Sequence, residues 1–356
     1  MNSNQTIGII GAGQLGLYMM QAAQNMGFSV VTYDPDINAP AHKYADTTFV
    51  NEFSDIEAFK RFYEKVDIIT YEFENIDESV LKLGQDKIPQ GIDLLNYSKH
   101  RFKELTLAQE LGIPTIKSVY LKNTNHSKEL SKLKLPLIQK TCQFGYDGKG
   151  QKICQKLDEI EVLEESLVSE YIKYDYEVSV ILIRGKHNTT CFPLIKNQHK
   201  GGILETSIPT KDTESIAIEY AEKIADHTNY IGVMAVEFFV KDGKVIFNEI
   251  APRPHNSGHY TLVGSYKSQF QLHIEAILGY ELDQAQNIDE ACVMLNVLGK
   301  DYLQAKNTYY KYENTHFYDY GKKGIKSDRK MGHIIFLGND AYDNAEKFKE
   351  GEKNGL

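Results

Sequence analysis

The stretch that organises this chain is Asn248-Glu249-Ile250-Ala251-Pro252-Arg253-Pro254-His255-Asn256-Ser257-Gly258-His259. It follows an apolar, strand-like run at residues 245–247. Each proline fixes its own φ and favours an extended conformation in the residue before it, so Arg253 is held stiffly on both sides. A rigid segment that offers a carboxylate, a guanidinium and short polar groups suits a place where phosphate, metal and substrate meet. The alternative is an ordinary strand exit, because loops favour Pro, Asn, Ser and Gly.

The residues just before this stretch predict a hairpin that carries two glutamates. Strand-like runs at 233–240 and 244–249 flank Asp242-Gly243, a strong hairpin signal. A three-residue loop would place Glu237 directly opposite Glu249, whereas a two-residue turn would set the pairing one residue out. Directly opposed like charges destabilise a sheet, so a bridging divalent cation would explain both. Carboxylates suit Mg²⁺, which binds them together with substrate phosphates. The alternative places the glutamates on opposite faces, with one of them solvated.

Composition narrows the class of protein. The 356 residues are 42% hydrophobic and 25% charged, as in ordinary soluble proteins, and the length suggests about two or three domains. The net charge of −9 argues against a general binder of nucleic acid or anionic membranes. No long apolar segment predicts a membrane span, and the first residues lack the pattern of a signal peptide. Four scattered cysteines without a C-x-x-C pair predict a reduced, cytoplasmic protein without structural zinc or disulfides.

The first region predicts a parallel, doubly wound sheet. Strand-like runs at 6–10, 28–33 and 66–71 alternate with helical patterns. The first strand runs into Gly11-Ala12-Gly13-Gln14-Leu15-Gly16, and the second ends at Asp34. This matches the dinucleotide fingerprint and would predict NAD, with Asp34 on its ribose. The same turn presents helix N–H groups to any anion, including a sugar phosphate.

The third strand ends in Tyr71-Glu72-Phe73-Glu74-Asn75. An acid at the carboxyl end of a parallel strand faces the crevice in which such sheets bind ligands. Glu72 and Glu74 share a face, so their spacing alone does not decide which one meets a ligand.

Two features of the middle region indicate a phosphate-binding site. Ser98 is a plausible N-cap for a helix that runs to Leu111. Arg101 lies in its first turns, where the helix dipole disfavours a cation, so Arg101 can face a ligand; a solvated side chain is the commoner alternative. A strand at 135–140 ends in Lys140, and a glycine-rich loop follows at 143–151. This loop can fold over phosphates beside Lys140, although a plain hairpin loop fits equally well. It is not the P-loop pattern.

The last region contains a basic run in an otherwise acidic chain. A strand at 291–299 precedes the run, which spans residues 322–330 and includes Lys322, Lys323, Arg329 and Lys330. Such a loop can clamp a substrate phosphate, and a solvated hairpin tip is the alternative. The polar tail after Asp340 is expected to fray.

Taken together, these motifs resemble the 5-(carboxyamino)imidazole ribonucleotide synthase family of the ATP-grasp superfamily. The resemblance covers nearly the whole chain, and its most specific part is the opening stretch extended to Tyr260. The motifs that carry it occur in the family's order: the glycine turn at 11–16, Thr70-Tyr71-Glu72-Phe73-Glu74-Asn75, the loop at 144–150, Val236-Glu237-Phe238-Phe239, residues 248–260, and Asp328-Arg329-Lys330-Met331-Gly332-His333.

The resemblance implies an α/β and α+β architecture with an ATP-grasp fold. It implies a Rossmann-like preATP-grasp domain with a parallel sheet at residues 1–95, an ATP-grasp domain at 96–290 and a small β-rich C-terminal domain at 291–356. It also implies a homodimer.

The resemblance further implies a set of site residues. Mg²⁺ would be held by Glu237 and Glu249. ATP would be bound by Arg101, Lys140, Gly145, Tyr146, Asp147, Gly148, Lys149, Gly150, Gln151, Glu170, Tyr171, Ile172, Glu177, His199, Asn248 and Glu249. Substrate would be bound by Gln14, Leu15, Glu72, Tyr146, Asp147, Arg253, His255, Asn256, Ser257, Lys322, Arg329 and Lys330. Arg253, His255, Tyr146 and Lys149 would be catalytic. Lys149 stands where arginine would be equally expected, and a lysine lacks arginine's bidentate geometry.

The implied reaction takes 5-aminoimidazole ribonucleotide, bicarbonate and ATP through carboxyphosphate to the N-carboxylated ribonucleotide, ADP and phosphate, in purine biosynthesis. A related ATP-grasp ligase, such as a formate-dependent glycinamide ribonucleotide transformylase, would share the fold, the paired glutamates and the basic run. An NAD-binding redox protein would explain the glycine turn and Asp34 but none of the other motifs.

Overall fold

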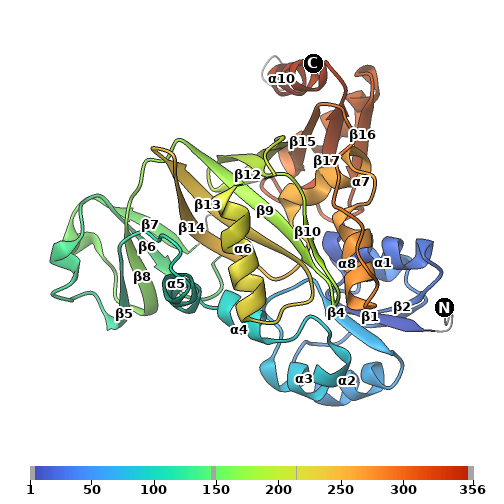
Figure 1. Ribbon diagram of the computed structural model, residues 1–356, viewed down its shortest axis with the longest axis horizontal. Coiled ribbons are helices and arrows are strands. Elements are labelled where there is room, and N and C mark those ends of the chain that lie inside the picture. The colour runs from blue at the N-terminus through green and yellow to red at the C-terminus, as the bar shows by residue number, and fades with distance from the viewer. Residues whose placement is uncertain (1–4, 146–149, 214, 352–356) are drawn as a thin grey trace.

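The computed structural model describes residues 5–145, 150–213 and 215–351. Within these ranges the chain forms a parallel sheet near the N-terminus, a small antiparallel sheet, and a large antiparallel sheet that runs from the centre into the C-terminal region (Figure 1). None of the helices in the described ranges combines the length and apolar character that a membrane crossing needs.

The N-terminal sheet confirms the predicted doubly wound start. Its strand order is β3-β2-β1-β4, and β1 pairs in parallel with both β2 and β4. Because parallel strands end at the same edge, the loops after β1 and β4 meet there. The elements are β1 (Thr6–Ile10), α1 (Gln14–Asn25), β2 (Ser29–Tyr33), β3 (Thr47–Phe49), α2 (Ile56–Tyr63), β4 (Ile68–Tyr71) and α3 (Glu78–Leu83).

The small sheet has the order β5-β8-β6-β7, and the second of the two helices that precede it packs against it (Figure 1). Its strands and the helices are α4 (Asp93–Ser98), α5 (Arg101–Glu110), β5 (Ser118–Thr124), β6 (Leu137–Thr141), β7 (Gln151–Cys154) and β8 (Leu163–Glu170).

The predicted helix start at Ser98 is wrong. Ser98 is the last residue of α4, and His100, in an extended conformation, is the N-cap of α5. The backbone N–H of Arg101 donates to the carbonyl of Cys142 at 3.0 Å, in the loop after β6. This contact satisfies one of the free N–H groups at the helix start, so a new helix begins at Arg101.

The large sheet has the order β14-β13-β9-β11-β12-β15-β17-β16, and β10 pairs with β9. Its strands are β9 (Tyr176–Arg184), β10 (Thr189–Cys191), β11 (Ile195–Lys200), β12 (Ile203–Pro209), β13 (Gly232–Lys241), β14 (Lys244–Ala251), β15 (Cys292–Leu298), β16 (Thr315–Asp319) and β17 (Lys330–Leu337). Residues 192–194 separate β10 from β11. Pro193 lies in the gap, where it offers no N–H to a ladder.

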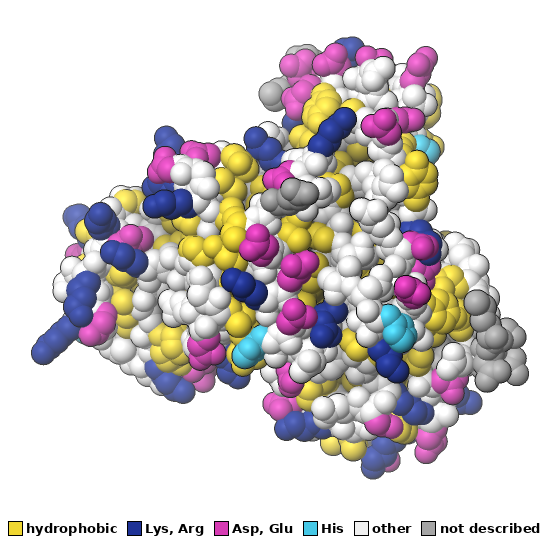
Figure 2. All heavy atoms as spheres, in the orientation of Figure 1, with side chains coloured by type: hydrophobic (Ala, Val, Ile, Leu, Met, Phe, Trp, Pro, Cys, Tyr) yellow, Lys and Arg dark blue, Asp and Glu magenta, His cyan; other side chains and the backbone are white. Residues whose placement is uncertain are grey.

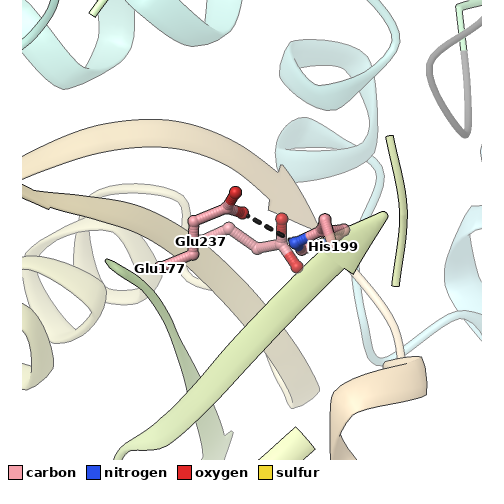
Figure 3. Close-up of side chains that lie close together, drawn as sticks. All are labelled: Glu177, His199 and Glu237. Atoms are coloured by element: carbon pink, nitrogen blue, oxygen red, sulfur yellow. Dashed lines mark ion pairs between the residues drawn. The ribbon is translucent and has the colours of Figure 1, made fainter. Parts of the chain in front are cut away.

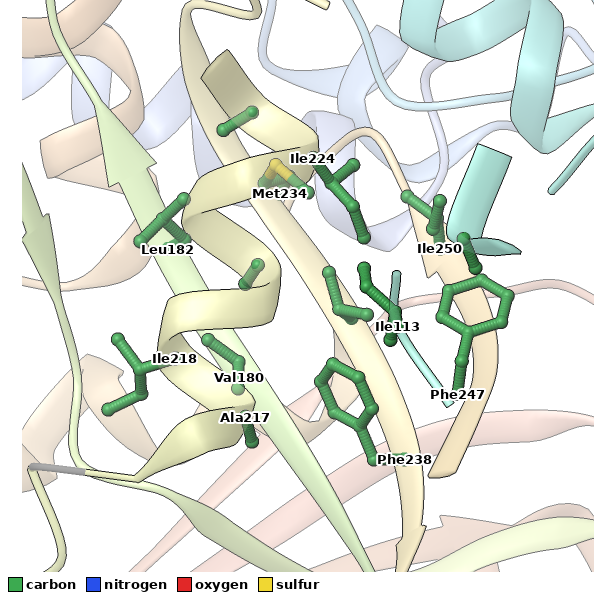
Figure 4. Close-up of a cluster of buried hydrophobic side chains, with 14 of the residues drawn as sticks. Ile113, Val180, Leu182, Ala217, Ile218, Ile224, Met234, Phe238, Phe247 and Ile250 are labelled. Carbon is green, nitrogen blue, oxygen red and sulfur yellow. The ribbon is translucent and has the colours of Figure 1, made fainter. Parts of the chain in front are cut away.

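Helices cover both faces of the central part of this sheet. Helix α6 (Ile216–His227) packs its apolar side onto β9 and β13, where Ile218 and Ile224 meet Val180, Met234 and Phe238 (Figure 4). Helix α8 (Gln269–Ile277) packs on the opposite face. The sheet core is therefore dry on both sides, and polar groups within it need hydrogen-bond partners.

The remaining described helical segments are short. They are η1 (Pro40–Lys43), η2 (Gln85–Lys87), η3 (Leu130–Lys132), η4 (Leu157–Glu159), η5 (Asn256–Tyr260), α7 (Thr261–Gly264), η6 (Gly299–Asp301), α9 (Tyr302–Thr308), η7 (Tyr309–Lys311) and α10 (Ala341–Gly351).

The β13–β14 hairpin combines the two predicted alternatives: it has a two-residue turn, and Glu237 is nevertheless opposite Glu249. Lys241 pairs with Lys244, so the turn has two residues, Asp242 and Gly243, both with positive φ as a tight hairpin turn requires. Phe238 pairs with Phe247, but the register then shifts and Glu237 pairs with Glu249. Asn248 is the extra residue of a β-bulge. The bulge returns the two glutamates to direct opposition.

The C-terminal strands extend the central sheet, because β15 pairs with β12 as well as with β17. Helix α10 packs on these strands, and its Ala341, Ala345 and Phe348 are buried there. The expected fraying after Asp340 is therefore wrong for the residues up to 351. Apolar side chains at spacings of four and three residues place one face of α10 on the sheet.

Replacing Phe348 by alanine tests this packing. Phe348 is 1% exposed, so Phe348→Ala should lower the free energy of unfolding of the C-terminal unit by about 3–5 kcal/mol. Urea unfolding followed by fluorescence and circular dichroism measures the change. Lys347→Ala, at an exposed position of the same helix, serves as the matched control. Equal stabilities of the two variants would contradict the packing of α10.

Candidate active site

The opposed glutamates form the centre of the site. Glu237 is 6% exposed, and Glu249, its partner across the hairpin, is partly exposed. Burial and the charge of Glu249 raise the pKa of Glu237 to about 8. Burial also acts on Glu249, but the charges of Arg101 and Lys140 outweigh it and lower the pKa of that carboxyl. Repulsion between the two carboxyls therefore opposes the ionisation of Glu237, and a divalent cation would let both carboxyls ionise.

Two cations, Arg101 and Lys140, act on Glu249. Arg101, the first residue of α5, lies with Nη1 3.3 Å from Glu249 Oε2. Its Nη2 donates to the carbonyl of Gly145 at 3.5 Å, where the glycine-rich loop begins. Lys140 lies on β6, and burial together with the nearby Arg101 lowers its pKa. Glu249 thus compensates the unfavourable placement of Arg101 at a helix N-terminus.

Glu104, one turn further along α5, belongs to the same group and was not predicted. Its Oε1 accepts a hydrogen bond from the Ile250 N–H at 3.0 Å, and burial raises its pKa to about 8. The contact joins β14, the strand that carries Glu249, to α5, the helix that carries Arg101. The i,i+3 spacing from Arg101 could have revealed it.

A second acidic cluster lies beside Glu237 (Figure 3). The side chains of Glu177 on β9, His199 on β11 and Glu237 on β13 converge, with ligand atoms within 4.8 Å of one another. His199 Nδ1 is 2.9 Å from Glu177 Oε2. Burial alone would lower the pKa of His199, but Glu177 and Glu237 outweigh it and raise that pKa. The cluster can present a protonated imidazole to an anion, or nitrogen and oxygen ligands to a cation.

Arg253, which lies between two prolines, forms an ion pair with the N-terminal domain. Arg253 Nε lies 2.6 Å from Glu74 Oε1, and Arg253 Nη1 donates to the Pro254 carbonyl at 3.1 Å. Glu74 follows β4, so the ion pair joins the loop of the parallel sheet to the exit of the hairpin. Glu74 and Glu72, which spacing could not separate, therefore have different partners.

His255 faces the glutamate pair as a neutral imidazole. Its Nδ1 accepts from the Ser257 N–H at 3.3 Å and lies 2.9 Å from Ser257 Oγ. Its Nε2 lies 3.6 Å from Glu237 Oε1. Burial and the charge of Arg253 lower the pKa of His255. Because Nδ1 accepts a hydrogen bond, the proton of the neutral ring is on Nε2, directed toward Glu237.

Neighbours of His255 fix its position. Gln269, which was not predicted, accepts from the His255 N–H at 3.0 Å and donates to the His255 carbonyl at 2.7 Å. Ser257 is buried with its hydroxyl at the His255 ring, so it lies behind the imidazole. Within the described residues, the Asn256 side-chain oxygen is buried and has no hydrogen-bond partner.

The glycine turn after β1 already holds an anion from the chain itself. Glu72 accepts hydrogen bonds from the N–H groups of Gly13 at 2.5 Å and Gly16 at 2.9 Å. A Cβ at Gly13 would lie 2.6 Å from Glu72 Oε1, so the glycine makes room for this carboxylate. Burial raises the pKa of Glu72 to about 7. The position that a dinucleotide phosphate would take is occupied, which removes the main support for an NAD site.

Gln14 and Leu15 open α1 directly beside this carboxylate. Leu15 is buried, whereas Gln14 is partly exposed. The predicted contact of this turn with a ligand therefore falls mainly to Gln14 and to the backbone.

The basic residues of the C-terminal run do not all face the same way in the structure. Lys330 opens β17, and its positive charge acts on both Glu237 and His255. Lys322 Nζ donates to the Lys330 carbonyl at 3.1 Å, whereas Lys323 is exposed. Arg329 folds back onto its own loop and donates to the Gly324 carbonyl at 3.1 Å. Lys322 and Lys330 thus lie together, and Arg329 does not join them.

Other predicted nucleotide contacts lie around the small sheet. Gln151 pairs with Lys140, and the Gly150 carbonyl accepts from the Thr141 N–H at 2.8 Å. Glu170 ends β8, where its Oε1 accepts from the Lys134 N–H at 3.0 Å. Tyr171 and Ile172 follow it in the chain, and Asn248 is the bulge residue of β14. The predicted residues Tyr146, Asp147, Gly148 and Lys149 lie outside the described residues.

Three family models match successive parts of the chain. Residues 4–89 match the ribonucleotide synthetase preATP-grasp domain, and residues 106–270 match the ATP-grasp domain. Residues 292–347 match the phosphoribosylaminoimidazole carboxylase C-terminal domain.

Curated relatives and solved structures match over nearly the full length. The N5-carboxyaminoimidazole ribonucleotide synthase of Staphylococcus aureus (strain N315) is 38% identical over 94% of this chain and 93% of the relative. The synthase of the same name from Staphylococcus epidermidis (strain ATCC 12228) is 39% identical over the same shares. The structure of N5-carboxyaminoimidazole synthetase from Staphylococcus aureus complexed with ADP has a TM-score of 0.90 at 34% identity, covering 99% of this chain and 100% of that one.

A more distant structure has the same overall fold. N5-carboxyaminoimidazole synthase from Aspergillus clavatus, in complex with ADP and 5-aminoimidazole ribonucleotide, has a TM-score of 0.89 at 26% identity, covering 99% of this chain and 100% of that one. The identity and coverage of the curated relatives establish that this chain belongs to the N5-carboxyaminoimidazole ribonucleotide synthase family of ATP-grasp enzymes.

Proposed function

We propose that the protein is an ATP-dependent carbon–nitrogen ligase that carboxylates 5-aminoimidazole ribonucleotide with bicarbonate in purine biosynthesis. The products are N5-carboxyaminoimidazole ribonucleotide, ADP and phosphate. One observation carries the proposal: the opposed Glu237 and Glu249 lie between the cations Arg101 and Lys140 on one side and His255 on the other. The names of the relatives support the same reaction.

Bicarbonate is a poor electrophile, and phosphorylation would activate it. An oxygen of bicarbonate attacks the γ-phosphorus of ATP, and the bond from that phosphorus to the ADP oxygen breaks. The substrate amine then forms a bond to the carboxyl carbon of carboxyphosphate, or of CO₂ released from it. Phosphate leaves and the amine loses a proton. Negative charge develops on the phosphoryl group, which Arg101 and Lys140 would stabilise.

The residues present fit a divalent cation. Glu237 and Glu249 would hold Mg²⁺, because two directly opposed carboxyls are favourable only when a cation offsets their repulsion. The ion would neutralise charge on the ATP phosphates. Glu177 and His199, which lie next to Glu237, would contact the nucleotide.

The other half of the site would bind bicarbonate and the ribonucleotide. Arg253 and His255 offer a guanidinium and an Nε2–H donor close to the glutamates, and Asn256 adjoins them. Lys322 and Lys330 would hold the ribose phosphate, and Glu72 would accept from ribose hydroxyls at the Gln14-Leu15 turn. The roles predicted for Tyr146, Asp147 and Lys149 stay predictions.

A cytoplasmic location and a homodimer are part of the proposal. Cys142, Cys154, Cys191 and Cys292 are free thiols, which fits a reducing compartment. Basic and acidic side chains are interspersed over the face in Figure 2, as expected for small-molecule substrates.

The reaction itself is tested by ADP formation. ADP formation should require bicarbonate and Mg-ATP and should be strongly stimulated by 5-aminoimidazole ribonucleotide, because the amine captures the carboxyphosphate that bicarbonate and ATP form. A coupled assay for ADP in degassed, bicarbonate-depleted buffer measures the dependence on each substrate. Formate-dependent turnover with glycinamide ribonucleotide that needs no bicarbonate would instead identify the transformylase.

Glu249→Gln tests the metal role. The change keeps the shape and removes the charge, so the rate of ATP turnover at saturating Mg²⁺ should fall by at least about 100-fold. Circular dichroism should show an intact fold. Glu57→Gln, whose parent side chain is 74% exposed on α2, is the matched control and should keep the wild-type rate. A near-normal rate for Glu249→Gln would exclude Glu249 from metal binding.

Lys322→Ala tests the phosphate clamp. Loss of a charge-assisted contact should raise the KM for 5-aminoimidazole ribonucleotide roughly tenfold or more, with a smaller effect on the KM for ATP. Steady-state kinetics with each substrate varied in turn give both values. Lys323→Ala, the exposed neighbour, should leave both near wild type. If the KM for ATP rises more, the basic run belongs to the nucleotide site.

A further inference from the structure

A row of buried polar side chains crosses the large sheet and ends at Glu237. It consists of Ser207 on β12, Asn197 on β11 and Ser179 on β9. Their exposed fractions are 0%, 4% and 0%. Asn197 pairs with Ser207 across β11 and β12, and Ser179 pairs with Glu237 across β9 and β13. None of the three was predicted from the sequence, and none has a role in the reaction described above.

Hydrogen bonds connect the row in one direction. Ser207 Oγ donates to Asn197 Oδ1 at 2.8 Å, and Asn197 Nδ2 donates to Ser179 Oγ. A serine hydroxyl has one proton, and Ser179 does not need it to satisfy Asn197. Ser179 Oγ therefore donates to Glu237 Oε1, at 3.5 Å. Each member accepts from the one before it, so the row delivers a donor to the carboxylate.

Packing alone does not explain these residues. Ser179 interrupts the apolar run Val178, Val180, Ile181, and serine and asparagine are poorly suited to buried strands. A buried hydroxyl or amide is tolerated only when it is hydrogen-bonded, and apolar residues would fill the same space without that requirement. Three adjacent strands nevertheless each carry one buried polar side chain, which indicates that the row serves to hydrogen-bond Glu237.

The charges and donors around Glu237 indicate what this hydrogen bond does. Glu177 and Glu249 repel its charge, while His199 and Lys330 attract it. Ser179 and His255 Nε2 both approach the same carboxylate oxygen, Oε1, at 3.5 and 3.6 Å. Because both groups contact Oε1, the second oxygen of Glu237 remains for an added cation. Groups that orient a ligand in this way tune metal affinity.

We propose that Ser179, Asn197 and Ser207 are positioning residues that orient Glu237 for a divalent cation, Ser179 by direct contact and the other two through it. The inference rests on the proposed function, in which Glu237 and Glu249 hold the ion. It predicts that the row controls metal affinity rather than nucleotide affinity.

Two variants alter the donor to Glu237 with small changes in shape. Ser179→Ala removes the hydroxyl. Asn197→Asp keeps the volume but leaves acceptor oxygens on both sides, so Ser179 turns its proton toward position 197 and away from Glu237. Ser207→Ala removes only the hydroxyl that is farthest from Glu237 in the row. Ser166→Ala is the matched control, since Ser166 is also a fully buried, hydrogen-bonded serine in a strand, on β8.

The measurement is the binding of Mn²⁺ to the full-length protein saturated with ADP, with free Mn²⁺ followed by electron paramagnetic resonance. Ser179→Ala and Asn197→Asp should weaken Mn²⁺ binding roughly 10- to 100-fold, and Ser207→Ala less. Ser166→Ala should bind as wild type. Calorimetry without metal should give unchanged ADP affinity for all variants, and thermal unfolding identifies any variant that fails to fold.

Glu237→Gln separates the two levels of the proposal. If Glu237→Gln binds Mn²⁺ like wild type, the metal site of the proposed function is wrong. If Glu237→Gln loses Mn²⁺ while folded Ser179→Ala retains it fully, the metal site stands and the positioning role is overturned. An equal loss of metal-free ADP affinity in Ser179→Ala would also overturn it, because the row would then support the nucleotide site as a whole.

Discussion

The direct opposition of Glu237 and Glu249 is the constraint on which the site depends. Two carboxyls on adjacent strands repel each other, and the sheet places them face to face only through the bulge at Asn248. A regular ladder from the two-residue turn would have moved Glu249 out of register, and in a strand each such step exchanges the two faces. The surrounding cations, Arg101 and Lys140, and the donors on Glu237 Oε1 are then arranged around a geometry that is unfavourable by itself.

The segment after the hairpin is where the separate sheets meet. Gln90 and Tyr230 both donate to the Pro252 carbonyl, at 3.3 and 2.6 Å. Glu74 from the parallel sheet holds Arg253, and Gln269 from α8 holds both backbone groups of His255. Prolines make the segment stiff, but these contacts determine where it lies. The positions of Arg253 and His255, which are proposed to face bicarbonate, thus depend on contacts from several parts of the chain.

Much of the fold and the identity of the central residues could be predicted from sequence, because they depend on local patterns. The parallel sheet and the Asp242-Gly243 turn follow from periodicity and turn chemistry, and the two glutamates were candidates for a pair, although their register stayed open between two turn lengths. The bulge could not be predicted, since nothing local distinguishes Asn248 from a regular strand residue. The helix start at Arg101 depends on the carbonyl of Cys142, and the burial of α10 depends on β15 and β17. Glu74, Gln269 and the Ser179–Asn197–Ser207 row have partners 10 to 180 residues away or on other strands, so no short motif reveals them.

The carboxylate of Glu72 in the glycine turn has a consequence for ligand discrimination. It sits on the two N–H groups that a diphosphate would otherwise use, so the protein carries its own mimic of that group. A dinucleotide would have to displace a buried side chain attached to the chain at high effective concentration, whereas a ribonucleotide that offers hydroxyls can bind with the carboxylate in place. In the proposed reaction, this turn would therefore select a sugar rather than a cofactor diphosphate. Inhibitors built on a ribose diol would then bind there, and adenine dinucleotides would be excluded.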